Sequence, residues 1–253
     1  MHITSWNVNS LNVRLPHVLQ YLHETAPDIL GLQELKQTDA AVDTTAIEAA
    51  GYHIATHGQK TYNGVALIAR EPLTDVVRGI PGYADEQARA IAASIGDVRV
   101  LNLYVPNGKA VGDEKYTYKL HWLDAATRYI DDLKREHPRL VITGDYNIAP
   151  ADLDVHDPDK WRDQILCSAP ERQALQNILA LGFKDAYRAL HPDTQQFSWW
   201  DYRMGGLRRN IGLRIDLTLA SDALALLDAG IDTAPRHWER PSDHAPAWVA
   251  IKP

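Results

Sequence analysis

The stretch ARAIAASIGDVRVLNLYV, residues 88–105, decides the architecture because it holds two short apolar runs with almost nothing between them. The runs are 88–94 and 99–105, and both have the composition of β-strands. A parallel pair of strands needs a crossover of about a dozen residues or more, whereas an antiparallel pair can be joined by a tight turn. These two runs are therefore predicted to form a hairpin, which argues against the alternative of a single parallel sheet.

Further apolar runs alternate with turn signals along the rest of the chain. We predict strands at 2–8, 28–34, 64–70, 139–145, 213–221 and 247–251. Helical spacing predicts a helix that Pro16 opens and that runs to Ala26, and two more over 116–134 and 170–181. Several strands are continuous apolar runs, which indicates sheets covered on both faces. We therefore predict an α/β fold, one domain over residues 1–253, with two packed sheets flanked by helices.

Composition limits the function only weakly. The chain has 253 residues, with 33 acidic and 26 basic side chains and a net charge of −7. An acidic total argues against a nucleic-acid partner, although carboxylates that hold a cation enter that sum and a local basic face can persist. The single cysteine, Cys167, excludes an internal disulfide. With no signal peptide or membrane span in the sequence, we expect a cytoplasmic protein.

Polar residues gather where the predicted strands end. They are Asn7, Glu34, Tyr104, Asn107, Asp145, Asn147, Asp216, Asp243 and His244. Taken singly, most have an ordinary interpretation: an asparagine fits a turn, and a glutamate after a strand is often solvated. Asp216 is different because it lies inside an apolar run, where a carboxylate needs a partner or a metal.

Taken together, these residues indicate a site for a hard cation with oxygen ligands. The sequence has no HExxH, no cysteine cluster, no P-loop, no dinucleotide-binding glycine loop and no GxSxG, which leaves metal-assisted phosphoester chemistry. Asp243 and His244 are neighbours in an extended segment, so their side chains point to opposite sides. The histidine therefore needs another carboxylate to fix its tautomer, and Asp216 is the natural candidate.

The sequence resembles the exonuclease III / abasic-site endonuclease family of the endonuclease/exonuclease/phosphatase superfamily. The resemblance covers nearly the whole chain and rests on the ordered strings WNVNSLNVR (6–14), LQELK (32–36), YNGVALI (62–68), NLYVPNG (102–108), GDYNIAP (144–150), FSWWDYR (197–203), GLRIDLTLAS (212–221) and PSDHAP (241–246). The segment ADLDVHDPDKW (151–161) is similar to the bacterial exonuclease III branch.

The resemblance implies a four-layered, DNase I-like α/β sandwich of two mixed sheets. It also implies a DNA repair enzyme of base excision repair, dependent on Mg²⁺ or Mn²⁺. Such an enzyme cuts duplex DNA 5′ to abasic sites and acts on blocked or recessed 3′ ends as a 3′-5′ exonuclease, 3′-phosphatase and 3′-phosphodiesterase. We expect it to be a monomer. The resemblance does not fix the balance among these activities, the number of metal ions, or whether the histidine acts as acid, base or charge stabiliser.

Residue roles follow from the same resemblance. The metal-site residues are Glu34, Asn7 and Asp243. The catalytic group is Asp145, which orients or deprotonates water, with Asn147, His244, Asp216 and Tyr104. The substrate-binding group is Asn107, Trp199, Leu213 and Arg203, with Trp199 and Leu213 walling a pocket for a flipped-out sugar.

Basic residues beside aromatic ones predict the DNA surface. One group is Arg203, Arg208, Arg209 and Arg214, and a second is Lys109, Lys115 and Lys119. Of the adjoining Trp199 and Trp200, we expect one to belong to the core. Two rival functions stay open on the sequence: a non-catalytic, RNA-linked regulator of the same fold, and a phosphatase of small phosphoesters.

Overall fold

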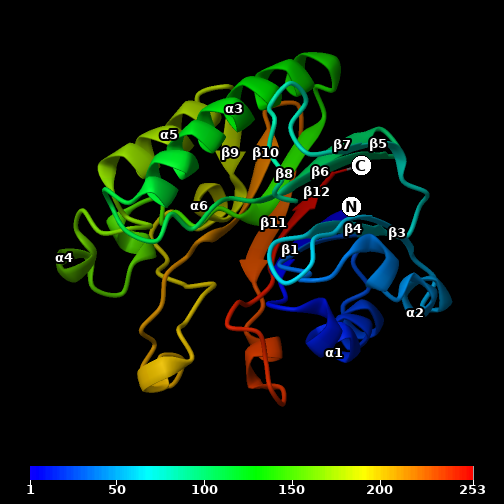
Figure 1. The fold of residues 1–253 in the computed structure, drawn as a ribbon, viewed down its shortest axis with the longest axis horizontal. Helices are drawn as coiled ribbons and strands as arrows, with labels where there is room; N and C mark the ends of the chain where they lie inside the picture. Colours follow the sequence, from blue (N-terminus) through cyan, green and yellow to red (C-terminus); the bar gives the residue numbers. More distant parts are fainter. Residues whose placement is uncertain (253) are drawn as a thin grey trace.

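Two six-stranded sheets are stacked face to face in the computed structural model, which describes residues 1–252 (Figure 1). The first sheet contains, in spatial order, β11 (Leu226–Ile231), β12 (Ala247–Ile251), β1 (His2–Asn7), β2 (Ile29–Gln33), β4 (Val65–Ala69) and β3 (His53–His57). The second contains β5 (Thr74–Arg78), β6 (Ala90–Ile95), β7 (Val98–Tyr104), β8 (Leu140–Asp145), β10 (Asp216–Ser221) and β9 (Phe183–Asp185). The predicted hairpin is confirmed as the antiparallel pair β6–β7.

Both sheets are mixed, and each contains one parallel pair. These pairs are β1–β2 and β7–β8, while the other neighbours are antiparallel. The chain from β1 to β2 passes through α1 (Leu11–Glu24), and the chain from β7 to β8 passes through α3 (Glu114–Glu136). A parallel connection of this kind places its helix on a face of the sheet.

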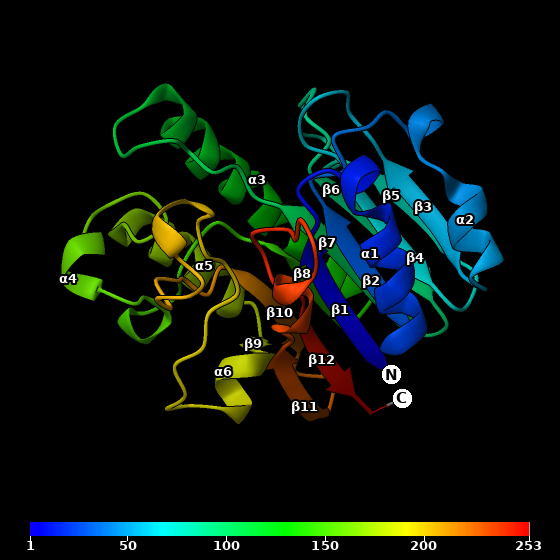
Figure 2. The same cartoon turned by 90° about the horizontal axis from the view of Figure 1, so that it is seen from below.

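Helices cover the outer faces of both sheets and complete four layers (Figures 1 and 2). The first sheet carries α1 and α2 (Thr44–Ala49), whose apolar residues pack with those of β2 and β4. The second carries α3 and α5 (Ala169–Leu179). The shorter elements are α4 (Pro158–Trp161), α6 (Ala186–Leu190), η1 (Asp39–Ala41), η2 (Asp152–Asp154), η3 (Arg203–Gly205) and η4 (Ala234–His237). The predicted α/β sandwich is confirmed.

The core has one layer between the sheets and one outside each of them. Ile3, Leu67 and Val100 belong to the layer between the sheets and are all 0% exposed. The continuous apolar runs of the sequence therefore reflect strands that bury side chains on both faces. Among residues 1–252, no helix combines the length and the apolar character that crossing a membrane requires.

Two predicted boundaries were wrong. The first helix begins at Leu11, so Pro16 lies inside it and does not open it. The backbone N–H groups of Ser10 and Leu11 donate to the carbonyls of Glu34 and Leu35, which starts the helix at the end of the strands. The strand predicted from 213 begins at Asp216, and Leu213 makes only isolated bridges to other loops.

Candidate active site

The sheet topology gathers the polar strand ends at one edge of the stack. Asn7 is the last residue of β1 and Glu34 directly follows β2, and these parallel strands end side by side. In the other sheet, Asp145 ends β8 and pairs in register with Asp216, the first residue of the antiparallel strand β10. His244 precedes β12, which runs antiparallel to β1. Residues from both sheets thus converge.

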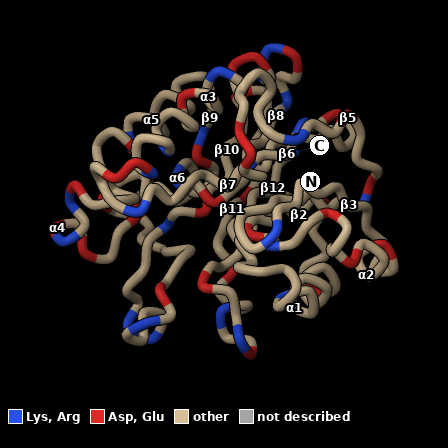
Figure 3. Tube along the Cα trace, viewed as in Figure 1, with Lys and Arg blue, Asp and Glu red and all other residues tan. Residues whose placement is uncertain are grey.

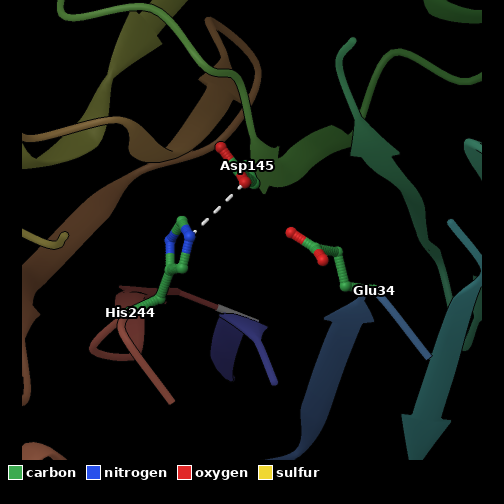
Figure 4. A group of neighbouring side chains, drawn as sticks. All are labelled: Glu34, Asp145 and His244. Carbon is green, nitrogen blue, oxygen red and sulfur yellow. Dashed lines mark ion pairs between the residues drawn. The ribbon is translucent and has the colours of Figure 1, made fainter. Parts of the chain in front are cut away.

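A compact group of possible metal ligands lies at this edge. Glu34, Asp145 and His244 each offer one ligand atom, and these atoms lie within 4.8 Å of one another (Figure 4). The Nδ2 of Asn7 donates to Glu34 Oε1 and to Asp145 Oδ2, at 2.9 Å in both cases. Two carboxylates this close repel each other unless positive charge lies between them. The oxygen-rich set therefore fits a hard divalent cation.

The predicted pairing of His244 with Asp216 is confirmed. The histidine Nδ1 lies 2.8 Å from Asp216 Oδ2 and 3.1 Å from Oδ1. The Ser198 hydroxyl donates to Asp216 Oδ2 at 2.6 Å and accepts the backbone N–H of the same aspartate. The carboxylate is therefore held on one side, and the ring turns its Nε2 to within 3.8 Å of Asp145 Oδ2.

Charge at the site is set by burial and by this carboxylate pair. Burial favours the neutral ring, but the negative charges of Asp216 and Asp145 outweigh it and raise the pKa of His244 to about 10. Burial also raises the pKa of Asp145 to about 7, although the charge of His244 opposes the shift. The imidazole is therefore a cation at neutral pH, and Asp145 changes its protonation near pH 7.

Asn107 and Asn147 meet beside this carboxylate. The Nδ2 of Asn107 donates to Asn147 Oδ1 at 3.2 Å, and the backbone N–H of Asn147 donates to Asp145 Oδ1 at 2.9 Å. The backbone of Asn147 has a positive φ of 49°, a conformation that asparagine tolerates better than most residues. Nearby, burial and the charge of Glu34 raise the pKa of Tyr104 well above its ordinary value, so its hydroxyl stays protonated.

Asp243 and the two pocket residues lie outside the three-residue group. Asp243 accepts hydrogen bonds from Asn9 Nδ2 at 2.9 Å and from Trp199 Nε1 at 3.0 Å. Trp199 is half-buried and exchanges two backbone hydrogen bonds with Leu213, which is 0% exposed. Trp200 is 3% exposed and packs in the core, which confirms that one of the two tryptophans is structural.

The prediction that basic side chains contact DNA was wrong for two residues. Arg214 is buried and forms ion pairs with Asp154 and Asp185. Lys119 is buried against Glu171. A side chain with no access to solvent cannot contact a DNA backbone. The other basic residues are on the surface, and the side chain of Arg203 is 86% exposed beside Asp201.

Several contributors were missed from the sequence. Asn9 accepts from Lys36 Nζ at 2.6 Å through Oδ1, and Lys36 also lies 3.1 Å from Glu34 Oε2. Asn9, Glu34 and Lys36 all have positive φ and lie beyond the ends of β1 and β2, so the side-chain alternation of a strand gave no signal for them. Ser198 gave no signal either, because its partner Asp216 is distant in the sequence.

Comparisons with known proteins identify the family of the chain. The sequence model of the endonuclease/exonuclease/phosphatase family matches residues 4–244. Exodeoxyribonuclease III of Haemophilus influenzae is 39% identical, with all of both chains covered. The 3′ phosphatase NExo from Neisseria, solved with a product DNA hairpin, is 47% identical with a TM-score of 0.98, covering 100% of this chain and 99% of that one. An AP endonuclease from Archaeoglobus fulgidus is 36% identical with a TM-score of 0.96 and full coverage of both chains. The chain therefore belongs to the endonuclease/exonuclease/phosphatase family and is a nuclease hydrolase of its exodeoxyribonuclease III branch.

Proposed function

We propose that this protein is a DNA repair nuclease that uses Mg²⁺, or Mn²⁺ in its place, to cut 5′ to abasic sites and to process 3′ ends. One observation carries the proposal: a carboxylate oxygen of Glu34, a carboxylate oxygen of Asp145 and a ring nitrogen of His244 lie within 4.8 Å of one another. Their convergence matches the chemistry of a phosphodiester attacked by water beside a divalent cation. The similarity to Neisseria NExo and to the Archaeoglobus fulgidus AP endonuclease supports DNA as the substrate.

The cation would be held mainly by Glu34, with Asp243 nearby and with Asn7 orienting the two carboxylates. When bound, such an ion neutralises charge that develops on phosphate oxygens. The Lys36 ammonium beside Glu34 keeps the carboxylate in place through a contact of 3.1 Å.

Asp145 would orient the attacking water and accept its proton, with Asn147 fixing the carboxylate. A pKa near 7 suits this work because the group must lose and gain a proton around neutral pH. His244, protonated and held by Asp216, would donate from Nε2 to a non-bridging phosphate oxygen. Positioning and preorganised charge would supply most of the rate.

Substrate contacts would surround this centre. Tyr104 and Asn107 would contact the scissile phosphate, and they also line a groove of about 600 Å³ with Tyr62, Lys109 and Lys115. Trp199 and Leu213 would wall the place for a displaced sugar, and Arg203 would hold the DNA backbone. Aromatic and basic side chains together suit a strand with one nucleotide out of the stack.

The direct test is incubation with duplexes that carry an abasic site, a 3′-phosphate or a recessed 3′ end. We expect Mg²⁺-dependent cleavage of at least one substrate and none in EDTA. Asp145→Asn should lower turnover at least ~100-fold with little change in DNA affinity, in line with loss of a general base. Tight RNA binding without cleavage of any duplex would contradict the proposal and favour the regulator of the same fold.

A further inference from the structure

Lys119 is a buried cation whose three N–H donors are all engaged next to the site. It lies in α3 and is 0% exposed. Its Nζ donates to Glu171 Oε1 at 2.5 Å, to the backbone carbonyl of Asn147 at 2.6 Å and to that of Asn107 at 3.2 Å. One ammonium group thus joins a helix to the two loops that follow β7 and β8.

Hydrogen bonds to neighbouring residues fix the carboxylate of Glu171, so it holds the Lys119 ammonium in one position. Its Oε1 accepts the backbone N–H of Leu166 at 3.1 Å. Its Oε2 accepts the N–H of Ser168 at 3.1 Å and the hydroxyl of Ser168 at 2.6 Å, as part of the capping box that begins α5. The carboxylate is 0% exposed and acts as a rigid anchor for the ammonium.

The loops are packed closely around the lysine. A Cβ added to Gly108, whose φ is +88°, would lie 3.1 Å from Lys119 Cδ and 2.9 Å from Ile165 Cδ1. The loop after β7 therefore rests directly on the lysine stem. In the loop after β8, the lysine ammonium holds the backbone carbonyl of Asn147 itself.

A buried ion pair of this kind has no general advantage in stability. Taking two charges out of water is costly, and well-packed apolar replacements of similar volume are often as stable as the ion pair or more stable. An apolar side chain, however, cannot donate to the carbonyls of Asn107 and Asn147. What the lysine adds is therefore the fixed position of these two carbonyls.

We infer that Lys119 is a positioning residue for the reaction: held by Glu171, its ammonium fixes both loops so that Asn107 faces the scissile phosphate and Asn147 holds the Asp145 carboxylate. The inference rests on the proposed function, because it assumes that Asn107 contacts the phosphate and that Asn147 orients Asp145. It adds a residue that touches neither substrate nor metal.

The test is the double variant Lys119→Met/Glu171→Gln, which removes both charges and leaves no unpaired buried ion. Activity is measured on the preferred duplex with Mg²⁺ and is referred to the folded fraction from circular dichroism. We expect kcat to fall about 30- to 100-fold while KM stays within about threefold, since a shift of about 1 Å in a positioning group has effects of this size. Amide exchange at Asn147 and Lys109, whose N–H groups close the two loops, should become faster.

Lys134→Met is the matched control. Lys134 lies on the same helix and donates to the carbonyls of Leu181 at 2.5 Å and Gly182 at 3.0 Å, away from the site. Its loss should leave kcat unchanged. Lys119→Gln/Glu171→Gln, which keeps a shorter donor and again leaves no unpaired buried ion, serves as the second variant if the first does not fold, and a several-fold loss of kcat is expected.

The outcomes separate the inference from the proposed function. If the wild-type protein cuts none of the duplexes, the proposed function fails. If the wild-type protein cuts and a folded Lys119 variant has kcat within twofold of it, only the positioning role is overturned. An equal drop in kcat in Lys134→Met would also overturn the positioning role, because both losses would then reflect a general loss of stability of α3.

Discussion

Asp216 sets the charge of the histidine that faces the phosphate in the proposed reaction. Its negative charge raises the pKa of His244, so its removal should lower that pKa. In Asp216→Asn we expect the alkaline fall of kcat to move from near pH 10 toward neutral pH, with at least ~10-fold lower turnover at pH 8. A kcat profile from pH 6 to 10.5 checks this.

Ser198→Ala is the control for that profile. It removes both hydrogen bonds between the Ser198 hydroxyl and Asp216 but keeps the carboxylate charge, so its alkaline fall should stay close to that of the wild type. An Asp216→Asn profile that coincides with the wild type would contradict the assigned role. The protonation of His244 also affects the stability of the fold. Its pKa is about 10 in the folded protein and 6.5 ordinarily, so the protonated ring stabilises the fold fully below pH 6.5, and this stabilisation is lost as the pH rises through 10.

Asp145 links metal binding to pH. Burial raises its pKa to about 7, so below that pH a cation must displace a proton. We expect the affinity for Mg²⁺ to rise about tenfold per pH unit below 7 and to level off above it. Calorimetric titrations between pH 5.5 and 8 measure this. In Asp145→Asn the slope should disappear, and an equal slope in both proteins would place the titrating group elsewhere.

For single residues, the sequence predicted a contact where side-chain directions in a strand, or the burial of a charged residue in an apolar run, restrict the possible partners. The pairing of Asp216 with His244 followed from opposite side-chain directions and from one acid in an apolar run. Arg214 and Lys119 were misassigned because a basic residue near aromatics looks the same whether it faces solvent or a buried acid. Their partners, Asp154, Asp185 and Glu171, lie far along the chain.

At the scale of elements, the strands that the sequence did not predict are the four at the sheet edges. They are β3, β5, β9 and β11. An edge strand has less of its surface covered, and β5 has only half-buried and exposed residues. Without a continuous apolar run, the pattern that predicted the central strands is missing. The central strands carry the site, so the site was predictable even though the full sheets were not.

The two sheets are also joined by a polar side chain in the middle of the core. Asn102 in β7 donates across the interface to the carbonyls of Leu32 and Ala66 at 2.8 and 2.9 Å, and accepts from Gln33 Nε2 at 2.6 Å. It is 0% exposed. Asn102→Leu should therefore lower the free energy of unfolding by about 2–4 kcal/mol, since buried polar partners lose their bonds.

Chemical denaturation measures that change. Thr143→Val is the graded control, because Thr143 contributes one long hydrogen bond of 3.3 Å to the Asn102 Oδ1, and it should cost less than about 1.5 kcal/mol. Equal losses in the two variants would mean that the bonds of Asn102 to the opposite sheet add nothing. Asn102→Leu also removes the hydrogen bond from Gln33, so we expect Glu34, which directly follows Gln33, to be held less firmly in this variant.

At the scale of the whole molecule, a net charge of −7 must be reconciled with a polyanionic substrate. Figure 3 shows Lys and Arg on the protruding loops that carry η3 and η4, with acidic residues on the same loops and residues of both signs over the rest of the chain. Acids in the interior also enter the total: Asp145, Asp154 and Asp216 are buried and in ion pairs. The net charge therefore does not describe the face that meets DNA.

If these loops follow the phosphate backbone, binding must weaken steeply with salt. Neutralising three to five phosphates gives a slope of about −3 to −5 for log affinity against log salt concentration. Anisotropy of a labelled abasic duplex with Asp145→Asn in EDTA, from 50 to 200 mM KCl, measures it. Arg208→Ala should make the slope shallower by about 1, while Arg135→Ala on the outer face of α3 should not change it. Each phosphate that a Lys or Arg neutralises releases counterions, so phosphate contacts always make affinity fall with salt. A flat response would therefore rule out these loops as the DNA surface.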